Sequence, residues 1–252
     1  MSTLARSSAA PRNMADPADD AAELSRLEGW LPALLSVIAG MVDLTGFFTL
    51  GHIFTAHVTG NLVVAAAAAV HGGPFNLAQA IALVVFMLAL AVVWSIAQAS
   101  HRRGPSLARL LLLVQLLLLA AVLIFSVITR PSAEPSGLAA GIAVMIAVSA
   151  MACQYALLRL AIPWAISTAV MTGNLTNTVL SLMDLLAKDR ALLPVDAGRL
   201  KRSVQFLIGF LFGCVAAAFA VDELEDWSWS LPLVLAGVAL ACAAGRRAEA
   251  VG

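Results

Sequence analysis

The residue with the greatest chemical potential in this sequence is Asp43, a carboxylate inside a long apolar stretch. Between Glu28 and Arg102 no other residue carries a formal charge. At the centre of a membrane helix, a charged carboxylate costs about 2.5–3.5 kcal/mol unless it is hydrated, paired or protonated. Asp43 is therefore predicted to form a proton or cation site. The alternative is a structural carboxylate that is hydrogen-bonded to neighbouring helices.

A polar motif occurs twice in the chain, as "TAHVTGN" at 55–61 and as "TAVMTGN" at 168–174. An offset of 113 residues aligns five identical residues of the seven. Thr and Asn cap helix N-termini well, and Gly permits close backbone approach, so each copy is predicted to open a helix whose free N–H groups face a polar site. Such a site would suit an anion, a carboxylate group or a neutral polar solute. Its candidate residues are Thr59, Gly60, Asn61, Thr172, Gly173 and Asn174. Alternatively, these residues only cap helices and join neighbouring helices by polar contacts.

Arg159 is the predicted partner of Asp43, because it falls near the end of the fifth apolar segment, close to the place of Asp43 in the repeat. The alternative for Arg159 is a side chain that extends to the membrane surface.

The four histidines lack a metal-ligand spacing and the three cysteines are far apart, so neither a metal nor a cofactor is expected. Two glycine pairs, Gly137/Gly141 and Gly209/Gly213, predict close helix packing.

Composition places the chain in a lipid bilayer. It is 61% hydrophobic and 12% charged, with a mean hydropathy of +0.93, whereas an average soluble domain has about 25% charged residues. The zero net charge offers no electrostatic basis for binding nucleic acid. Residues 1–28 have too little apolar content to pack and are expected to form a disordered tail. Residues 29–246 are expected to form a single membrane domain, and 247–252 a C-terminal tail.

Eight apolar segments predict an all-α, polytopic membrane helix bundle with an internal repeat, its halves at about 30–130 and 137–246. The second and sixth segments are short or polar for a lipid-facing span. We therefore predict six crossings plus two re-entrant Thr-Gly-Asn segments. This topology places fourteen of the fifteen Lys and Arg residues inside, whereas the alternative, eight crossings in two parallel four-helix halves, places eleven. The segments lie near 31–51, 58–71, 76–99, 107–129, 137–158, 168–187, 203–221 and 227–245.

A family resemblance extends over nearly the whole chain after the tail. The stretch "GMVDLTGFFTLGHIFTAHVTGN", followed by the second "MTGN", resembles the YoaK-like family of bacterial inner-membrane proteins, a domain of unknown function. The second half of that family usually carries a Gln-Asn-Ala signature, where this chain has Gln154, Tyr155 and Ala156. The resemblance implies a multi-pass protein of the bacterial inner membrane and adds Gln154 to the site candidates. It implies no established substrate.

These features favour a small secondary transporter or channel for a polar solute, because duplicated halves, an intramembrane acid and paired helix breaks are what such proteins use. The expected partners are the lipid bilayer and a small polar solute or ion, while the oligomeric state stays open. An enzyme is not expected, since the sequence lacks His-Glu-x-x-His and Gly-x-Ser-x-Gly. The alternative is a structural or regulatory membrane protein without transport activity.

Overall fold

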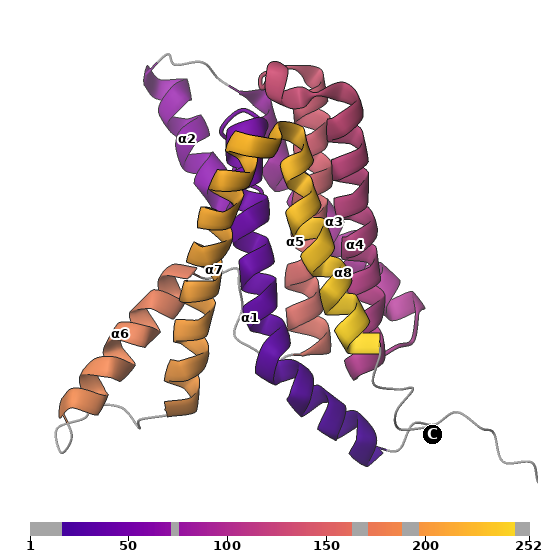
Figure 1. Cartoon of the computed structure of the whole chain (residues 1–252), viewed down its shortest axis with the longest axis vertical. Helices are drawn as coiled ribbons and strands as arrows, with labels where there is room; N and C mark the ends of the chain where they lie inside the picture. Colours follow the sequence, from indigo (N-terminus) through magenta and orange to yellow (C-terminus); the bar gives the residue numbers. More distant parts are fainter. Residues whose placement is uncertain (1–16, 72–75, 163–170, 188–196, 245–252) are drawn as a thin grey trace, which may run out of the picture.

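The computed structural model describes residues 17–71, 76–162, 171–187 and 197–244, and this part of the chain is a bundle of α-helices without strands (Figure 1). The predicted all-α class is confirmed. The helices are α1 (Pro17–Thr49), α2 (Val58–His71), α3 (Leu77–Ala99), α4 (Gly104–Thr129), α5 (Leu138–Ala161), α6 (Met171–Ala187), α7 (Ala197–Leu224) and α8 (Ser230–Ala244), with short 3-10 helices η1 (Pro131–Ala133) and η3 (Glu225–Trp229).

Five segments of the described chain are long and apolar enough to cross a membrane. The fifth contains most of α7 together with η3 and α8, and α7 and α8 form a hairpin in Figure 1. By contrast, α2 and α6 have only 14 and 17 residues. The five segments are Ala21–Thr49, Leu77–Ala99, Gly104–Thr129, Leu138–Ala161 and Leu200–Ala244.

The N-terminal boundary differs from the predicted one, because α1 begins at Pro17 and residues 17–28 are helical. Leu27 is buried in the core, and Arg109 of α4 donates two hydrogen bonds of 2.9 Å to the carboxylate of Glu23. Contacts with α4 thus order a segment whose composition alone indicates disorder. The predictions for residues 1–16 and for the C-terminal tail lie outside the described residues.

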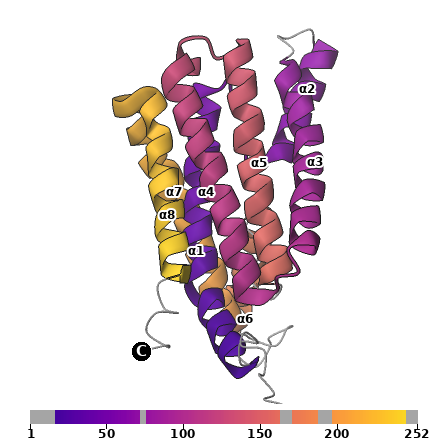
Figure 2. The same cartoon turned by 90° about the vertical axis from the view of Figure 1, so that its right-hand side faces the viewer.

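The two short helices run in opposite directions from near the middle of the bundle. In Figures 1 and 2, α2 extends to the upper end, where α1 ends and α5 begins, whereas α6 extends to the lower end. Their first residues, Val58 and Met171, are separated by the same 113 residues as the two motifs. The chain reverses after α1 at Gly51 and His52, whose φ angles are 80° and 59°. Glycine adopts this left-handed region without steric cost.

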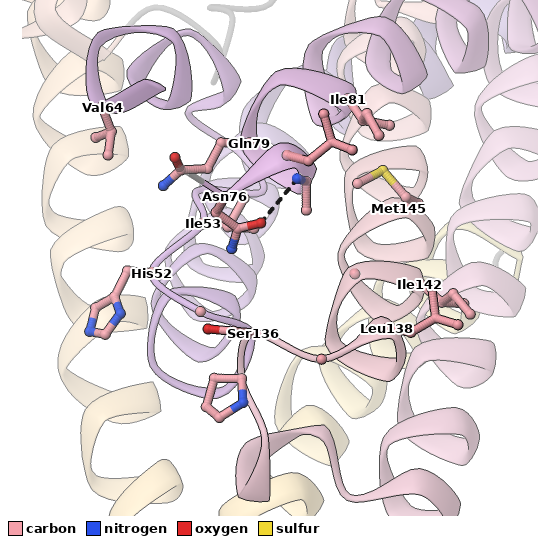
Figure 3. Close-up of a pocket in the computed structure, with 16 residues that line it drawn as sticks. His52, Ile53, Val64, Asn76, Gln79, Ile81, Ser136, Leu138, Ile142 and Met145 are labelled. Atoms are coloured by element: carbon pink, nitrogen blue, oxygen red, sulfur yellow. Dashed lines mark hydrogen bonds between the residues drawn. The ribbon is translucent and has the colours of Figure 1, made fainter. Parts of the chain in front are cut away.

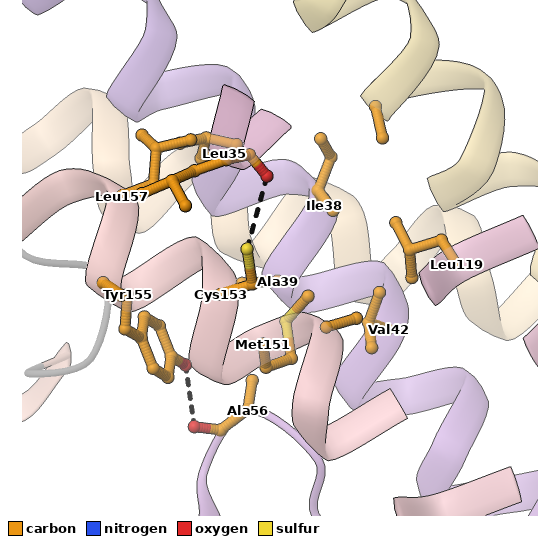
Figure 4. Packing of buried hydrophobic residues seen from close by; sticks show 14 of the residues in the cluster. Leu35, Ile38, Ala39, Val42, Ala56, Leu119, Met151, Cys153, Tyr155 and Leu157 are labelled. Atoms are coloured by element: carbon orange, nitrogen blue, oxygen red, sulfur yellow. Dashed lines mark hydrogen bonds between the residues drawn. The ribbon is translucent and has the colours of Figure 1, made fainter. Parts of the chain in front are cut away.

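Helices α1 and α5 form the centre of the bundle. Helix α1 packs mainly on α7 and α8, α5 packs on α3 and α4, and the short helices α2 and α6 pack on α3 and α7. Figure 4 shows part of the apolar core, with Leu35, Ile38 and Val42 of α1 and Met151 and Leu157 of α5. Since lipid tails are as apolar as these side chains, shape-complementary packing holds such helices together.

The contact between α1 and α7 depends on glycine. A Cβ atom on Gly213 would lie 2.2 Å from the carbonyl oxygen of Val37, and one on Gly40 would lie 2.2 Å from that of Phe210. The predicted packing role of Gly209/Gly213 is confirmed. The same prediction for Gly137/Gly141 was wrong, because a Cβ atom on Gly141 would meet nothing within 4 Å and Gly137 is the N-cap of α5.

Candidate functional site

The centre of the candidate site is the Asp43 carboxylate, whose side chain is 7% exposed on α1. Its Oδ1 accepts hydrogen bonds from the backbone N–H groups of Thr55 and Ala56, both at 2.8 Å, and from that of His57 at 3.4 Å. These N–H groups immediately precede α2, where an anion is favoured. In the first motif, the anion at the helix start is therefore the chain's own carboxylate.

The second oxygen of this carboxylate pairs with a histidine. Asp43 Oδ2 lies 2.6 Å from Nδ1 of His57, a distance typical of a strong, charge-assisted hydrogen bond. The His57 side chain is 32% exposed, and its ring meets that of Phe210 on α7 edge to face at 5.1 Å. The pair thus joins a buried acid to an imidazole that reaches the edge of the site. Such an arrangement can take up and release a proton.

The loop of residues 54–57, which links α1 to α2, is held from three sides. The Asn61 side chain, fully buried on α2, accepts a hydrogen bond from Phe54 N–H at 2.9 Å and donates one to Phe54 C=O at 2.7 Å. Tyr155 of α5 donates its hydroxyl proton to Ala56 C=O at 2.7 Å. The Thr55 hydroxyl donates to Val42 C=O at 3.1 Å. Both the oxygen and the nitrogen of the Asn61 amide therefore hold the loop in position.

The remaining motif residues do not share one pocket within the described chain. Thr59 and Thr172 are exposed, while Gly60 sits against the Phe54 ring. Asn174 is buried and has interactions of its own. Helix α2 packs on α3, whereas α6 packs on α7, so the two motif helices have different neighbours. The motif residues Thr168 and Ala169 lie outside the described residues.

Two predicted site residues have other positions. The pairing of Asp43 with Arg159 was wrong: Arg159 is exposed in the last turn of α5, at the lower end of the bundle, whereas Asp43 lies toward the upper end of α1. Gln154 is fully buried, accepts a hydrogen bond from Gln115 Nε2 at 2.7 Å and donates one to Leu35 C=O at 2.9 Å. It connects α5 to α4 and α1, which is a structural role.

The residue that sequence reasoning missed is His57, which it weighed only as a metal ligand. A signal in the sequence could have found it. At the offset of 113 that aligns the two motifs, Asp43 aligns with Ala156 and His57 with Val170, so the acid and the histidine both have apolar counterparts. Among the described residues, no group of three or more His, Cys, Asp or Glu side chains is placed to hold a metal ion.

The long apolar helices and the buried acid–histidine pair define a multi-pass integral membrane protein. The chain belongs to the family described as "Protein of unknown function (DUF1275)", whose model matches residues 31–244. This match confirms the YoaK-like resemblance. No curated protein and no solved structure matches the chain.

Proposed function

We propose that this protein is a small secondary transporter for a polar solute and that the Asp43–His57 pair couples it to protons. The observation that carries the proposal is the position of this pair, at the turn between a full-length helix and a half-length one. Ionisable groups inside membrane proteins commonly mark ion pathways and proton relays. Broken helices near the middle of the bilayer are where secondary transporters bind substrates and coupling ions.

We also propose that the two halves are related as an inverted repeat, an arrangement that supports transport. In such a repeat, helices α1 to α4 correspond in order to α5 to α8. The contact between α1 and α7 then has its counterpart in the contact between α5 and α3, and that between α1 and α8 in the contact between α5 and α4. Likewise, the packing of α2 on α3 corresponds to the packing of α6 on α7. The contact between α1 and α4 lacks an equally extensive counterpart. The opposite directions of α2 and α6 agree with inversion of one half. Inverted repeats allow a transporter to open alternately to either side.

The topology that we propose has six crossings, by α1, α3, α4, α5, α7 and α8, and two re-entrant helices, α2 and α6, in a bacterial inner membrane. Among the described Lys and Arg residues, only Arg130 lies at the upper end of the bundle. The acidic Asp222, Glu223, Glu225 and Asp226 lie at the same end. By the positive-inside rule, the lower end is therefore cytoplasmic.

Reporter fusions test this topology. A reporter at Arg102 is expected to be cytoplasmic and one at His71 external, because α2 returns to the side that α1 reached. With eight crossings, both locations would be reversed. Activity of a periplasmic reporter at Arg102, together with a cytoplasmic signal at His71, would remove the six-crossing proposal.

The coupling step that we propose acts through the loop of residues 54–57. The ionised Asp43 carboxylate attracts three backbone N–H groups and the His57 ring. Protonation of the carboxylate removes its charge and weakens these charge-assisted hydrogen bonds. The loop and the start of α2 then become freer to move. Proton binding and movement of this element are thus linked, as coupled transport requires.

Reconstituted protein tests the transport activity. Proteoliposomes that contain the trapped pH dye pyranine are exposed to a panel of small neutral amides and polyols. At least one solute is expected to move protons faster than in protein-free liposomes, because solute and proton share one conformational cycle. If correctly folded protein moves no protons with any of these solutes, coupled transport of neutral polar solutes is wrong.

The alternative is a structural or regulatory membrane protein without transport. One observation favours it: both oxygens of the Asp43 carboxylate are already engaged within the protein, so the group could serve only to fix the loop. We propose no enzymatic activity in either case, since the sequence lacks the hydrolase and metalloprotease motifs. Variants of Asp43 distinguish a coupling carboxylate from a structural one.

A further inference from the structure

A cavity of about 920 Å³ lies at the upper end of the bundle, beside the Asp43 loop. Figure 3 shows His52 and Val64 on one side, Ile142 and Met145 of α5 on the other, and Gln79 between them. Ligand cavities for small molecules typically measure about 300–1,000 Å³. The cavity is therefore large enough for a small organic solute.

The described residues that line this cavity are mainly apolar and include no Asp, Glu, Lys or Arg. His52, which is exposed, is the only ionisable residue among them. A charged ligand would gain no opposite charge from this wall and would contact mainly apolar side chains, which is unfavourable. The cavity therefore selects for a neutral ligand. Its apolar lining includes Ile53, Val64, Ile81, Leu138, Ile142 and Met145.

Two amide side chains give the cavity a polar region. Gln79 is 4% exposed, and its amide makes no side-chain hydrogen bond within the described part of the chain. The Asn76 Oδ1 caps α3 by accepting from Ala78 N–H at 3.0 Å, which leaves its NH₂ group as a donor (Figure 3). The Gln79 amide faces the cavity and still offers both a donor and an acceptor. A ligand with both an acceptor and a donor could therefore pair with it.

The floor of the cavity is open because of a glycine. Gly141 of α5 lines the cavity, and a Cβ atom there would meet nothing within 4 Å. A large side chain at this position can therefore occupy the cavity without displacing the helix. The packed Gly213, by contrast, has no such space.

We propose that this cavity binds a neutral solute that carries a polar carboxamide, or a similar paired donor and acceptor, on an apolar body. Transport of that solute rests on the proposed function, whereas binding does not. The wall at residues 51–53 continues directly into the loop of residues 54–57 that Asp43 and Asn61 hold. Occupancy of the cavity is thereby linked in space to the acid–histidine pair.

Calorimetric titration of the protein in lipid nanodiscs tests this site, with 2-naphthamide as the neutral probe and 2-naphthoate as its charged analogue. Empty nanodiscs correct for partitioning into lipid. We expect saturable binding of 2-naphthamide and at least tenfold weaker binding of 2-naphthoate. Gln79→Leu is expected to weaken amide binding about tenfold, the equivalent of losing about 1.4 kcal/mol of hydrogen bonding. Gly141→Phe should abolish it, while Gly29→Phe, the same change at another open glycine, should not.

Three results would overturn the site: no saturable binding of 2-naphthamide, equal binding of 2-naphthoate, or unchanged binding by both cavity variants when these are monodisperse. Binding of 2-naphthamide without any proton-coupled flux would refute only the proposed transport. Flux with other solutes but without naphthamide binding would refute only this cavity.

Discussion

Asp43→Asn is expected to yield a folded protein without proton-coupled flux, whereas Asp43→Leu is expected to unfold. The Asn side chain keeps an oxygen that can accept from Thr55 and Ala56 N–H, but it cannot ionise. The Leu side chain leaves three N–H groups without their acceptor, at about 1–3 kcal/mol for each buried group. This loss is comparable to the whole stability of many domains.

Thermal unfolding in detergent and pyranine flux in proteoliposomes separate these two effects. His57→Gln serves as a matched variant, because it removes the second ionisable member and retains a hydrogen-bonding side chain. In the transport proposal, both Asp43→Asn and His57→Gln lower the flux at least tenfold with little change in melting temperature. If Asp43→Asn carries protons and solute as the natural protein does, the carboxylate is structural and the coupling proposal fails.

Gly213→Leu is expected to separate α1 from α7 and to prevent stable assembly of the bundle. A Cβ atom at this position would already lie 2.2 Å from the Val37 carbonyl oxygen, a backbone atom that no rotamer change can move. Overpacking typically costs about 1–3 kcal/mol and occasionally more. Because the obstacle is backbone, we expect the upper end of this range, about 3 kcal/mol, even for Gly213→Ala.

The control for this glycine is Gly141→Ala, where the added methyl group meets nothing within 4 Å. It should keep the natural melting temperature or raise it slightly, since alanine favours a helix more than glycine does. Both variants are compared by thermal unfolding and by gel filtration in the same detergent. Equal stability of Gly213→Ala and Gly141→Ala would contradict the close α1–α7 contact.

The sequence by itself determined the class of protein and the order of its helices. Continuous apolar runs can only be accommodated as helices in a bilayer, so composition and segment length were sufficient for the all-α membrane fold. The repeated motif also located the starts of α2 and α6, whose first residues lie within it. Thr59, Gly60 and Asn61 nevertheless lie inside the first turn of α2, where Asn61 holds the preceding loop. The 14 apolar residues at 58–71 correctly indicated that α2 is too short for an ordinary crossing.

Only the tertiary structure decided which groups meet. Asp43 and His57 are 14 residues apart and belong to a helix and a loop, so no helical periodicity relates them; the path of the loop after Gly51 brings them together. The expected partner, Arg159, was chosen from the linear repeat, although antiparallel α1 and α5 place the two residues toward opposite ends. Likewise, the two glycine pairs have identical spacing, yet one packs against a neighbouring backbone and the other borders a cavity. Spacing records which residues share a helix face, whereas the neighbour opposite that face depends on how all the helices assemble.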